Sequence, residues 1–432
     1  MNYVKEIDKW ILENKDEILN RLSELVRIKT INVPPSGNEK FGQEYIADMC
    51  SKFISSKNID LFELDEVKDI RKNKLFFPTI DGIERIYKNR PNLVVKIPGN
   101  GDGKSIIFSG HIDTMPVKEK EWNVFKDPFS GKIKDGKMYG RGTADMKAGT
   151  LSGFFALKCL HDLNIKLKGD VYAESVVDEE YGGVNGTIAA RMRYPNIDFA
   201  ILSEPSGLNV GVKSRGGVDI KISVIEESYG GISFNSPPPN PIFKLSKIAL
   251  VLQKYDRYRN KKLKALFKKK DYLPLFVYQI ASGGLGYFES GSIPVQGHIY
   301  CWLEILSDMN PDEVRIEFKD FMKKELNKYS EFKNYYPEFK EVIRFLEGHN
   351  TDLNNSAMKS ISKAYKDIGI KYNEKSLNFA CDAFAFKKCS KTDVVVIGPK
   401  GGNLHGMDEF VEIDSVLSLI KIMVLTAIDY CS

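Results

Sequence analysis

Four short apolar runs, each followed by an acidic or histidine-bearing loop, constrain the fold of this chain more than any other feature. The runs are KSIIFSG at 104–110, GDVYAESVV at 169–177, IDFAIL at 197–202 and TDVVVIGP at 392–399. Short β-branched runs bounded by glycine or proline are typical of strands. An open α/β sheet binds its ligands at the C-terminal ends of its strands. The pattern therefore predicts an α/β fold with polar side chains gathered at one edge of a sheet.

The loops around these strand ends contain two imidazoles and three carboxylates. The set is His111, Asp145, Glu180, Glu204 and His405. Imidazole nitrogens and carboxylate oxygens are ligands that a pair of borderline divalent metals takes. Each residue alone has an ordinary alternative, such as a helix cap for Asp145 or a solvated surface pair for Glu179 and Glu180. Because five such residues in this order are improbable by chance, the set predicts metal-assisted hydrolysis.

Two further acids lie beside the predicted ligands. Asp113 follows His111 by two residues, so both side chains point to the same side of an extended chain. Asp113 is therefore predicted to accept the second imidazole N–H of His111 and to fix the tautomer that binds metal. Glu179 precedes Glu180, and adjacent carboxylates can give one ligand to a metal and leave the other free as a general base.

Composition excludes several classes of protein. The chain has 432 residues, of which 42% are hydrophobic and 28% charged, which is ordinary for a globular protein of about two domains. No run reaches the roughly 20 apolar residues of a membrane helix, and the charged N-terminus lacks a secretory signal. We therefore expect a cytoplasmic protein that makes no contact with a membrane. Six cysteines without CxxC spacing are expected to be reduced thiols.

The net charge of +5 owes much to one local run, KKLKALFKKK at 261–270. Such a run could be a nucleic-acid patch or the solvated face of a helix. The helix is the better interpretation, with Leu263, Leu266 and Phe267 facing inward, because no interleaved stacking aromatics accompany the run. We expect no nucleic-acid partner.

The character of the chain changes between residues 209 and 344. This segment contains strand-like runs and two predicted helices, from about 241 to 256 and after NPDE at 310–313, but none of the predicted ligands. We interpret residues 209–344 as an inserted domain, with residues 1–208 and 345–432 as the two parts of a catalytic domain.

The chain resembles the M20 family of metallopeptidases and deacylases, which includes acetylornithine deacetylases, succinyl-diaminopimelate desuccinylases and glutamate carboxypeptidases. The resemblance rests on a collinear series of motifs. These are RPNLVVKIPG, SGHIDTMPV, WNVFKDPFSGKIKDGKMYGRGTADMKAG, DEEYGGVNGT, SEPSGLNVGVKSRGG, CDAFAF and GPKGGNLHGMDEFVEI. It implies a zinc-aminopeptidase-like catalytic domain, with a mixed sheet flanked by helices, and an inserted α+β lid through which a homodimer is expected to form.

The resemblance also implies a role for each site residue. Two divalent metal ions, zinc or alternatively cobalt, would share the bridging carboxylate of Asp145. One would be held by His111 and Glu204, and the other by Glu180 and His405. By the same matching, Glu179 is the general base and proton shuttle, and Asp113 is the acid that orients His111.

The predicted lid departs from the family pattern. No histidine is present in GGISFNSPPPNP at 230–241, where the family carries one, and residues 287–306 contain neither the asparagine nor the substrate-carboxylate arginine of the family. Arg215, Asn235, His298 or a partner subunit are the alternatives as substitutes. The residues that bind the substrate are therefore not predicted.

Two hypotheses follow from these motifs. In the first, the chain is a two-metal hydrolase that cleaves a peptide or N-acyl bond in a small amino-acid-like substrate other than the familiar ones. In the second, it is a metal-binding protein of the same fold with weak or no hydrolysis, which binds a ligand or supports assembly. The presence of both Glu179 and Asp113 favours the hydrolase, since a binding protein needs no proton shuttle.

Overall fold

The structure is a computed structural model that describes residues 3–117, 122–226, 240–267, 272–283 and 294–432. Within these residues the chain forms two compact units, Met1–Ser214 with His349–Ser432, and Arg215–Gly348. None of the helices in the described part of the chain is long and apolar enough to span a bilayer.

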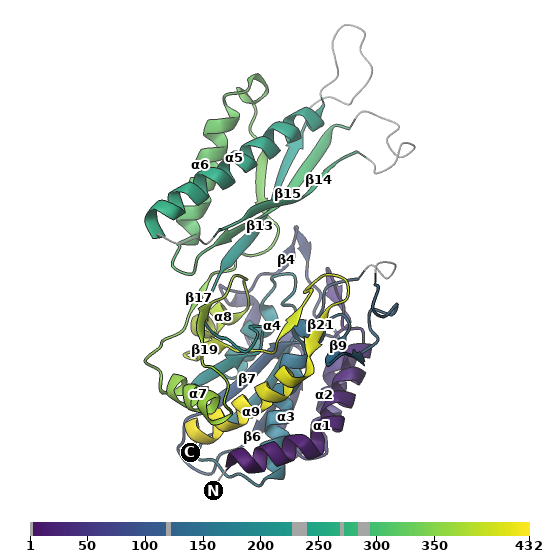
Figure 1. The fold of residues 1–432 in the computed structure, drawn as a ribbon. Coiled ribbons are helices and arrows are strands. Elements are labelled where there is room, and N and C mark those ends of the chain that lie inside the picture. Colours follow the sequence, from purple (N-terminus) through teal and green to yellow (C-terminus); the bar gives the residue numbers. More distant parts are fainter. Residues whose placement is uncertain (1–2, 118–121, 227–239, 268–271, 284–293) are drawn as a thin grey trace. The chain divides into compact units, whose positions relative to one another are not determined.

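The first unit is built on a nine-stranded mixed sheet (Figure 1). Its strand order is β17-β12-β19-β11-β7-β10-β6-β3, and β18 pairs with β12. The bounds are β3 Ile59–Phe62, β6 Asn92–Ile97, β7 Ile106–His111, β10 Val171–Val176, β11 Phe199–Leu202, β12 Val210–Ser214, β17 His349–Asn350, β18 Glu374–Ser376 and β19 Asp393–Val396. The four runs predicted as strands are β7, β10, β11 and β19, and they are mutually parallel. Their C-terminal ends therefore lie at one edge of the sheet, as the sequence predicts.

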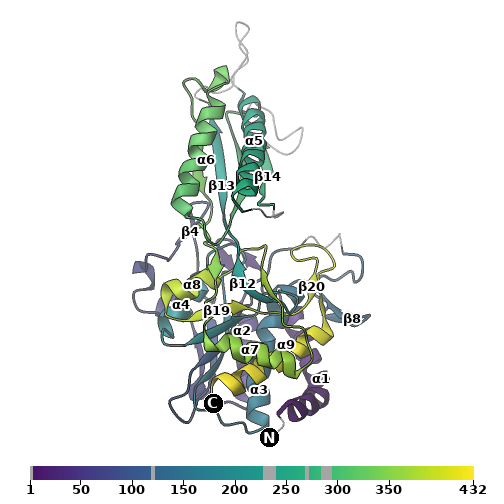
Figure 2. The same ribbon diagram turned by 60° about the vertical axis from the view of Figure 1, so that its left-hand side comes forward.

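Helices cover both faces of this sheet (Figures 1 and 2). On one face α3 packs on β7 and β10, and α9 packs on α3, α1 and α7; on the other, α4 packs against α8. The helices are α1 Tyr3–Arg27, α2 Lys40–Ser51, α3 Ala148–Asp162, α4 Asn185–Arg193, α7 Ser356–Asp367, α8 Ala383–Cys389 and α9 Ile413–Tyr430. Alternation along β7 explains the two layers, since Phe108 meets α3 at Gly153 whereas Ile107 joins the cluster containing Phe386 of α8. The predicted α/β class with a mixed sheet flanked by helices is confirmed.

Short antiparallel elements complete the first unit. β8 Lys132–Lys134, β9 Lys137–Tyr139, β21 Phe410–Glu412 and β20 Gly401–Gly402 form a small sheet in the order β20-β21-β9-β8. Two hairpins, β1 Asn32–Val33 with β2 Ser36–Gly37 and β4 Thr79–Ile80 with β5 Ile83–Glu84, precede β6. The small sheet matters for the site, because it carries the loop with His405 between β20 and β21.

The second unit is a four-stranded antiparallel sheet with helices α5 Pro241–Phe267 and α6 Pro311–Leu326 (Figure 2). Its strands are β13 Gly216–Ile225, β14 Leu275–Ser282, β15 Gln296–Ile305 and β16 Glu338–Glu341, in the order β14-β15-β13-β16. Alternate residues of β13 from Val218 to Val224 pack with α5 and α6 in one apolar core. α6 begins where the NPDE motif predicts, because the Asn310 side chain accepts the Asp312 N–H at 2.8 Å and Pro311 has no N–H that would need an acceptor.

The basic run at 261–270 begins inside α5, which extends to Phe267. Leu263 is buried, as predicted for the inner face of this helix. The side chains of Leu266 and Phe267, and residues 268–270, lie outside the described residues.

Buried His349 in β17 gives the first unit an expected response to acid. Burial, with a smaller contribution from the charge of Lys387, lowers the pKa of His349 from 6.5 to about 4. Between these values the unfolded chain binds more protons than the folded chain, so stability falls as the pH drops from 6.5 to 4. We expect the metal-free protein to lose up to roughly 3 kcal/mol more over this window than a His349→Gln variant.

Urea unfolding curves of both proteins at several pH values measure this difference. Glutamine is neutral throughout and can still donate to Thr351, whose hydroxyl lies 2.9 Å from His349 Nε2. Parallel acid profiles for the two proteins would contradict the prediction.

Candidate metal centre

The edge of the sheet brings all five predicted ligands together. His111 is the last residue of β7 and pairs in register with Val176 of β10. Glu180 therefore follows just beyond the neighbouring strand, and Glu204 lies two residues after β11. Asp145 lies in the turn before α3, and His405 lies between β20 and β21. Segments separated by almost 300 residues thus supply one cluster.

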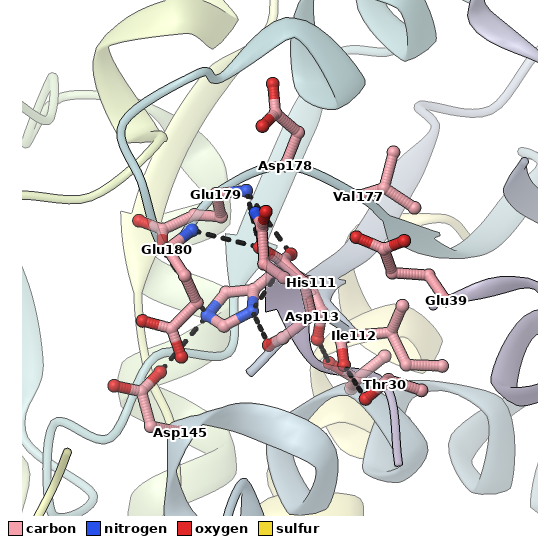
Figure 3. A network of polar contacts seen from close by, with 12 residues as sticks. Thr30, Glu39, His111, Ile112, Asp113, Asp145, Val177, Asp178, Glu179 and Glu180 are labelled. Carbon is pink, nitrogen blue, oxygen red and sulfur yellow. Dashed lines mark hydrogen bonds and ion pairs between the residues drawn. The ribbon is translucent and has the colours of Figure 1, made fainter. Parts of the chain in front are cut away.

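Asp145 is at the centre of this cluster. One of its oxygens lies 3.1 Å from His111 Nε2, and the other lies 3.1 Å from His405 Nε2. His405 Nε2 is also 2.8 Å from Glu180, and His111 Nε2 is 3.8 Å from Glu204. Figure 3 shows His111, Asp145 and Glu180 converging on one space. A carboxylate that presents one oxygen to each of two imidazoles has the geometry of a bridge between two ligand sets.

Two overlapping groups of these side chains could each hold a metal ion. One consists of His111, Asp145 and Glu180, and the other of His111, Glu179 and Glu204; the donor atoms of each group lie within 4.8 Å of one another. Nitrogen and carboxylate oxygen donors at this spacing suit zinc and related metals. The donor chemistry therefore fits the binding of divalent metal ions. Glu179, predicted as the general base, is close enough to be counted among the donors.

The electrostatics of the cluster also favour cation binding. Burial raises the pKa of Glu179, Glu180 and Glu204 above the ordinary range of a carboxyl group. Burial alone would lower the pKa of His405, but the nearby carboxylates of Glu180 and Asp145 outweigh it and raise that pKa to about 11. Since the His405 side chain is 49% exposed, water screens part of this attraction. Carboxylates outnumber imidazoles here, and bound cations would balance their charge.

Asp113 contacts His111 differently from the prediction. The nearest acceptor to His111 Nδ1 is the backbone carbonyl oxygen of Asp113 at 3.0 Å, whereas the Asp113 carboxylate is 3.6 Å away. That carboxylate accepts the side-chain amide of Asn32 at 2.9 Å and the backbone N–H groups of Glu179 and Glu180 at 3.1 Å. Asp113 thus orients the imidazole through its backbone and the Glu179–Glu180 turn through its side chain.

Glu409 is a site residue to which the sequence assigned no role. One of its oxygens accepts the backbone N–H groups of Ala144 and Asp145, and the other accepts Gly142 N–H and the Arg141 guanidinium at 2.7 Å. Arg141 also donates to the carbonyl oxygen of His405 at 2.9 Å. Glu409 and Arg141 therefore hold the Asp145 and His405 loops against each other. The sequence did contain a signal for Glu409, since this residue ends the LHGMDE motif that contains His405.

Asp382 is a second residue without a predicted role, although it belongs to the CDAFAF motif. It is buried beside the cluster and hydrogen-bonded to Thr187. Burial raises the pKa of Asp382 to about 7. Its position at the start of α8 depends on long-range packing, which local sequence patterns do not reveal.

The structure describes two of the three residues that could substitute for the missing lid groups. Arg215 forms an ion pair with Glu304 at 2.6 Å, and His298 of β15 packs edge-on against Tyr300 with ring centroids 5.3 Å apart. Asn235 and the whole GGISFNSPPP stretch lie outside the described residues, as do residues 287–293. The pairing of Arg215 leaves its charge neutralised within the second unit.

Comparisons with known proteins identify the family of this chain. Residues 107–429 match the model of the peptidase family M20/M25/M40, so the chain belongs to this family. Over 221 residues it is 33% identical to N-formyl-4-amino-5-aminomethyl-2-methylpyrimidine deformylase of Halalkalibacterium halodurans, and this alignment covers 50% of this chain and 45% of that enzyme. The chain thus spans less than half the length of this curated relative.

Solved structures share the fold across the whole chain. The di-peptidase Dug1p of Saccharomyces cerevisiae has a TM-score of 0.76 at 14% identity, with 100% of this chain and 99% of that chain covered. A dinuclear metal-binding M20 peptidase of Bacillus subtilis has a TM-score of 0.60 at 14% identity, with 96% and 99% covered. At such identities the likeness shows the fold alone.

Proposed function

We propose that this chain uses two divalent metal ions to hydrolyse an amide bond in a small N-acylated amine or short peptide, with Glu179 as general base. The observation that carries the proposal is the position of Asp145, whose two carboxylate oxygens lie 3.1 Å from His111 and 3.1 Å from His405, respectively. His111 and Glu204 would hold one metal, and Glu180 and His405 the other. An M20 peptidase of similar fold is named as dinuclear, which supports two metals but says nothing of which residues hold them.

The metals, when bound, would supply Lewis acidity toward the scissile carbonyl and lower the pKa of water. The chain's own contribution is proton transfer. Glu179 Oε2 lies 3.7 Å from His111 Nε2, at the edge of the ligand cluster. From there it would take a proton from the attacking water and deliver it to the leaving amine. In the metal-free site, burial raises the pKa of Glu179 above that of an exposed glutamate.

We further propose that the substrate is not recognised through a free α-carboxylate. Residues 287–306, where the family's carboxylate-binding arginine would fall, contain no arginine and no asparagine. The deformylase relative is named for an N-formyl aminomethylpyrimidine, a compound without a carboxylate. An N-acyl amine on an apolar or aromatic body is therefore the substrate class that these observations support best.

Matched pairs of substrates test this proposal. The zinc-loaded and cobalt-loaded protein would be incubated with N-formyl and N-acetyl amines, each beside its α-carboxylated counterpart, and products followed by mass spectrometry. We expect cleavage of the uncharged member to exceed that of the carboxylated member by about tenfold or more in kcat/KM. Preference for the carboxylated members would refute the substrate class while leaving hydrolysis in place.

The missing lid groups favour one alternative, a metal-binding M20 protein without efficient hydrolysis. An oxyanion donor contributes about 10²–10³ in rate, so its loss without a substitute would leave weak turnover. Two bound metals per chain with no cleavage of any pair would support this alternative. Zinc or cobalt as the native metal, a homodimer through the lid and a cytoplasmic location stay predictions.

A further inference from the structure

A buried polar network lies beneath the loop that carries Glu179 and Glu180. In Figure 3 the carboxylate of Asp178 points away from Asp145, although it directly precedes Glu179 in the chain. Asp178 is fully buried and has a φ of 67°, a left-handed conformation that few residues other than glycine adopt. A non-glycine residue keeps such a conformation only where its surroundings fix it.

The surroundings of Asp178 come from the segment between β5 and β6. Arg85 donates to one oxygen of Asp178 at 2.7 Å, and the hydroxyl of Tyr87 donates to the other at 2.6 Å. Arg85 reaches past Asp178 to the carbonyl oxygen of Tyr181 at 2.8 Å. These two side chains, which we call the Arg85–Tyr87 clamp, thus hold the loop on both sides of Glu179 and Glu180.

Asn92, the first residue of β6, holds the two ends of the loop. The Asn92 side chain accepts Val177 N–H at 3.1 Å and donates to the carbonyl oxygen of Gly186 at 2.8 Å. Arg90 forms a two-oxygen ion pair with Glu39, at 2.6 Å for its closest contact, and lies 3.8 Å from Asp178. Two guanidinium groups therefore balance two carboxylates in a site where every partner is 3% exposed or less.

Because the charges in this buried network balance, each side chain has to keep its partner. Removing one partner leaves an uncompensated buried charge, which is strongly unfavourable. On its opposite side the loop is held by the Asp113 carboxylate, which accepts both the Glu179 and Glu180 N–H groups. The backbone that aims these two carboxylates at the histidines is therefore fixed between two sets of hydrogen bonds.

We propose that Arg85 and Tyr87 are positioning residues, which act through Asp178 to hold Glu179 and Glu180 in their orientation toward the metal cluster. The proposal rests on the proposed function for its catalytic consequence, but the positioning itself can be measured without turnover. Neither Arg85 nor Tyr87 is a predicted metal ligand or base, so their effect has to pass through the loop.

The test replaces Tyr87 by phenylalanine in the full chain, which keeps the ring but removes the hydrogen bond that the hydroxyl donates to Asp178 and the one that it accepts from Asn185. Tyr172→Phe is the matched control, because its hydroxyl donates to Asp170 at 2.7 Å at the opposite end of strand β10. Arg85→Lys is a second variant, since lysine keeps the charge but cannot bridge Asp178 and Tyr181. Amide hydrogen exchange at Glu179 and Glu180, zinc affinity and kcat are measured for all four proteins.

For both clamp variants we expect the two amides to exchange about tenfold faster or more, the size expected for one lost hydrogen bond to a charged group. Zinc affinity and kcat should fall by about 10–100-fold, as for other groups that orient metal ligands, with little change in KM. The control should change none of these quantities. If the network only stabilised the fold, the clamp variants would have a lower melting temperature without a selective effect on these amides.

The outcomes separate this inference from the proposed function. Unchanged exchange at Glu179 and Glu180 in both clamp variants would overturn the inference, whatever their activity. Faster exchange with undiminished zinc affinity and kcat would overturn it as well. Faster exchange and weaker zinc binding in a protein that cleaves nothing, even as the wild type, would support the inference and count against hydrolysis.

Discussion

Replacing Glu179 by glutamine is expected to lower turnover by about 10²–10⁴-fold, the usual contribution of a general base. The amide has the size of the carboxylate but cannot take a proton from water. Metal content should stay near that of the wild type, because the proposed ligands are unchanged. The measurement is kcat/KM on any cleaved N-acyl amine, with metals counted by mass spectrometry on the same samples.

The metal count decides between two roles for Glu179. Its oxygen lies close enough to His111 and Glu204 to be a donor, so loss of a metal from the glutamine variant would identify it as a ligand and refute the role of free base. Glu63→Gln is the control, since Glu63 is half-buried next to the short β3 strand and glutamine can still accept the Asn89 N–H that Glu63 accepts at 2.9 Å. Full activity of Glu179→Gln with both metals bound would contradict the proposed mechanism.

Replacing Asp145 by alanine is expected to remove both metals rather than one. Each oxygen of Asp145 is 3.1 Å from a different histidine, so its loss disrupts both ligand sets. We expect metal content after dialysis to fall from about two per chain to near zero, with no detectable turnover. Added zinc stabilises only a protein that binds it, by about 4 kcal/mol at a thousandfold excess over Kd. The melting temperature of the wild type should therefore rise with zinc, and that of the variant should not.

Asp60→Ala provides the comparison for this experiment. Asp60 is also a paired carboxylate, held by Arg193 at 2.6 Å, but it lies in β3 at the far edge of the same sheet. The Asp60→Ala variant should keep both metals and the zinc-dependent rise in melting temperature. One metal retained in Asp145→Ala would show that Asp145 belongs to a single ligand set and is not a bridge.

Much of the fold could be predicted because strands and their loops leave local signals. The β-branched runs that became β7, β10, β11 and β19 are each bounded by turn residues, and their order with intervening helices is sufficient to predict a largely parallel core. The helix at α6 was predictable from its Asn-Pro start. The elements against which α6 packs could not be predicted, since packing between distant elements leaves little trace in local patterns.

Part of the candidate site could likewise be predicted from the sequence, and part could not. The ligand types and their order along the chain point to His111, Asp145, Glu180, Glu204 and His405, and the structure brings them together. The sequence did not reveal that the Asp113 carboxylate binds two backbone N–H groups, or that Glu409 holds the Asp145 turn. Both roles depend on where backbone amides point, and that direction exists only once the loops are folded.

The sequence by itself determined the α/β class and pointed to the five candidate donors and the neighbouring acids Asp113 and Glu179. Spacing and residue type leave local signals of these features, because imidazoles and carboxylates are common ligands of divalent metals and strands carry characteristic β-branched runs. Only the tertiary structure decided how those groups are aimed. The clamp of Arg85 and Tyr87 on Asp178 joins segments more than 90 residues apart. Its geometry follows from the need to pair every buried charge, which no local pattern encodes.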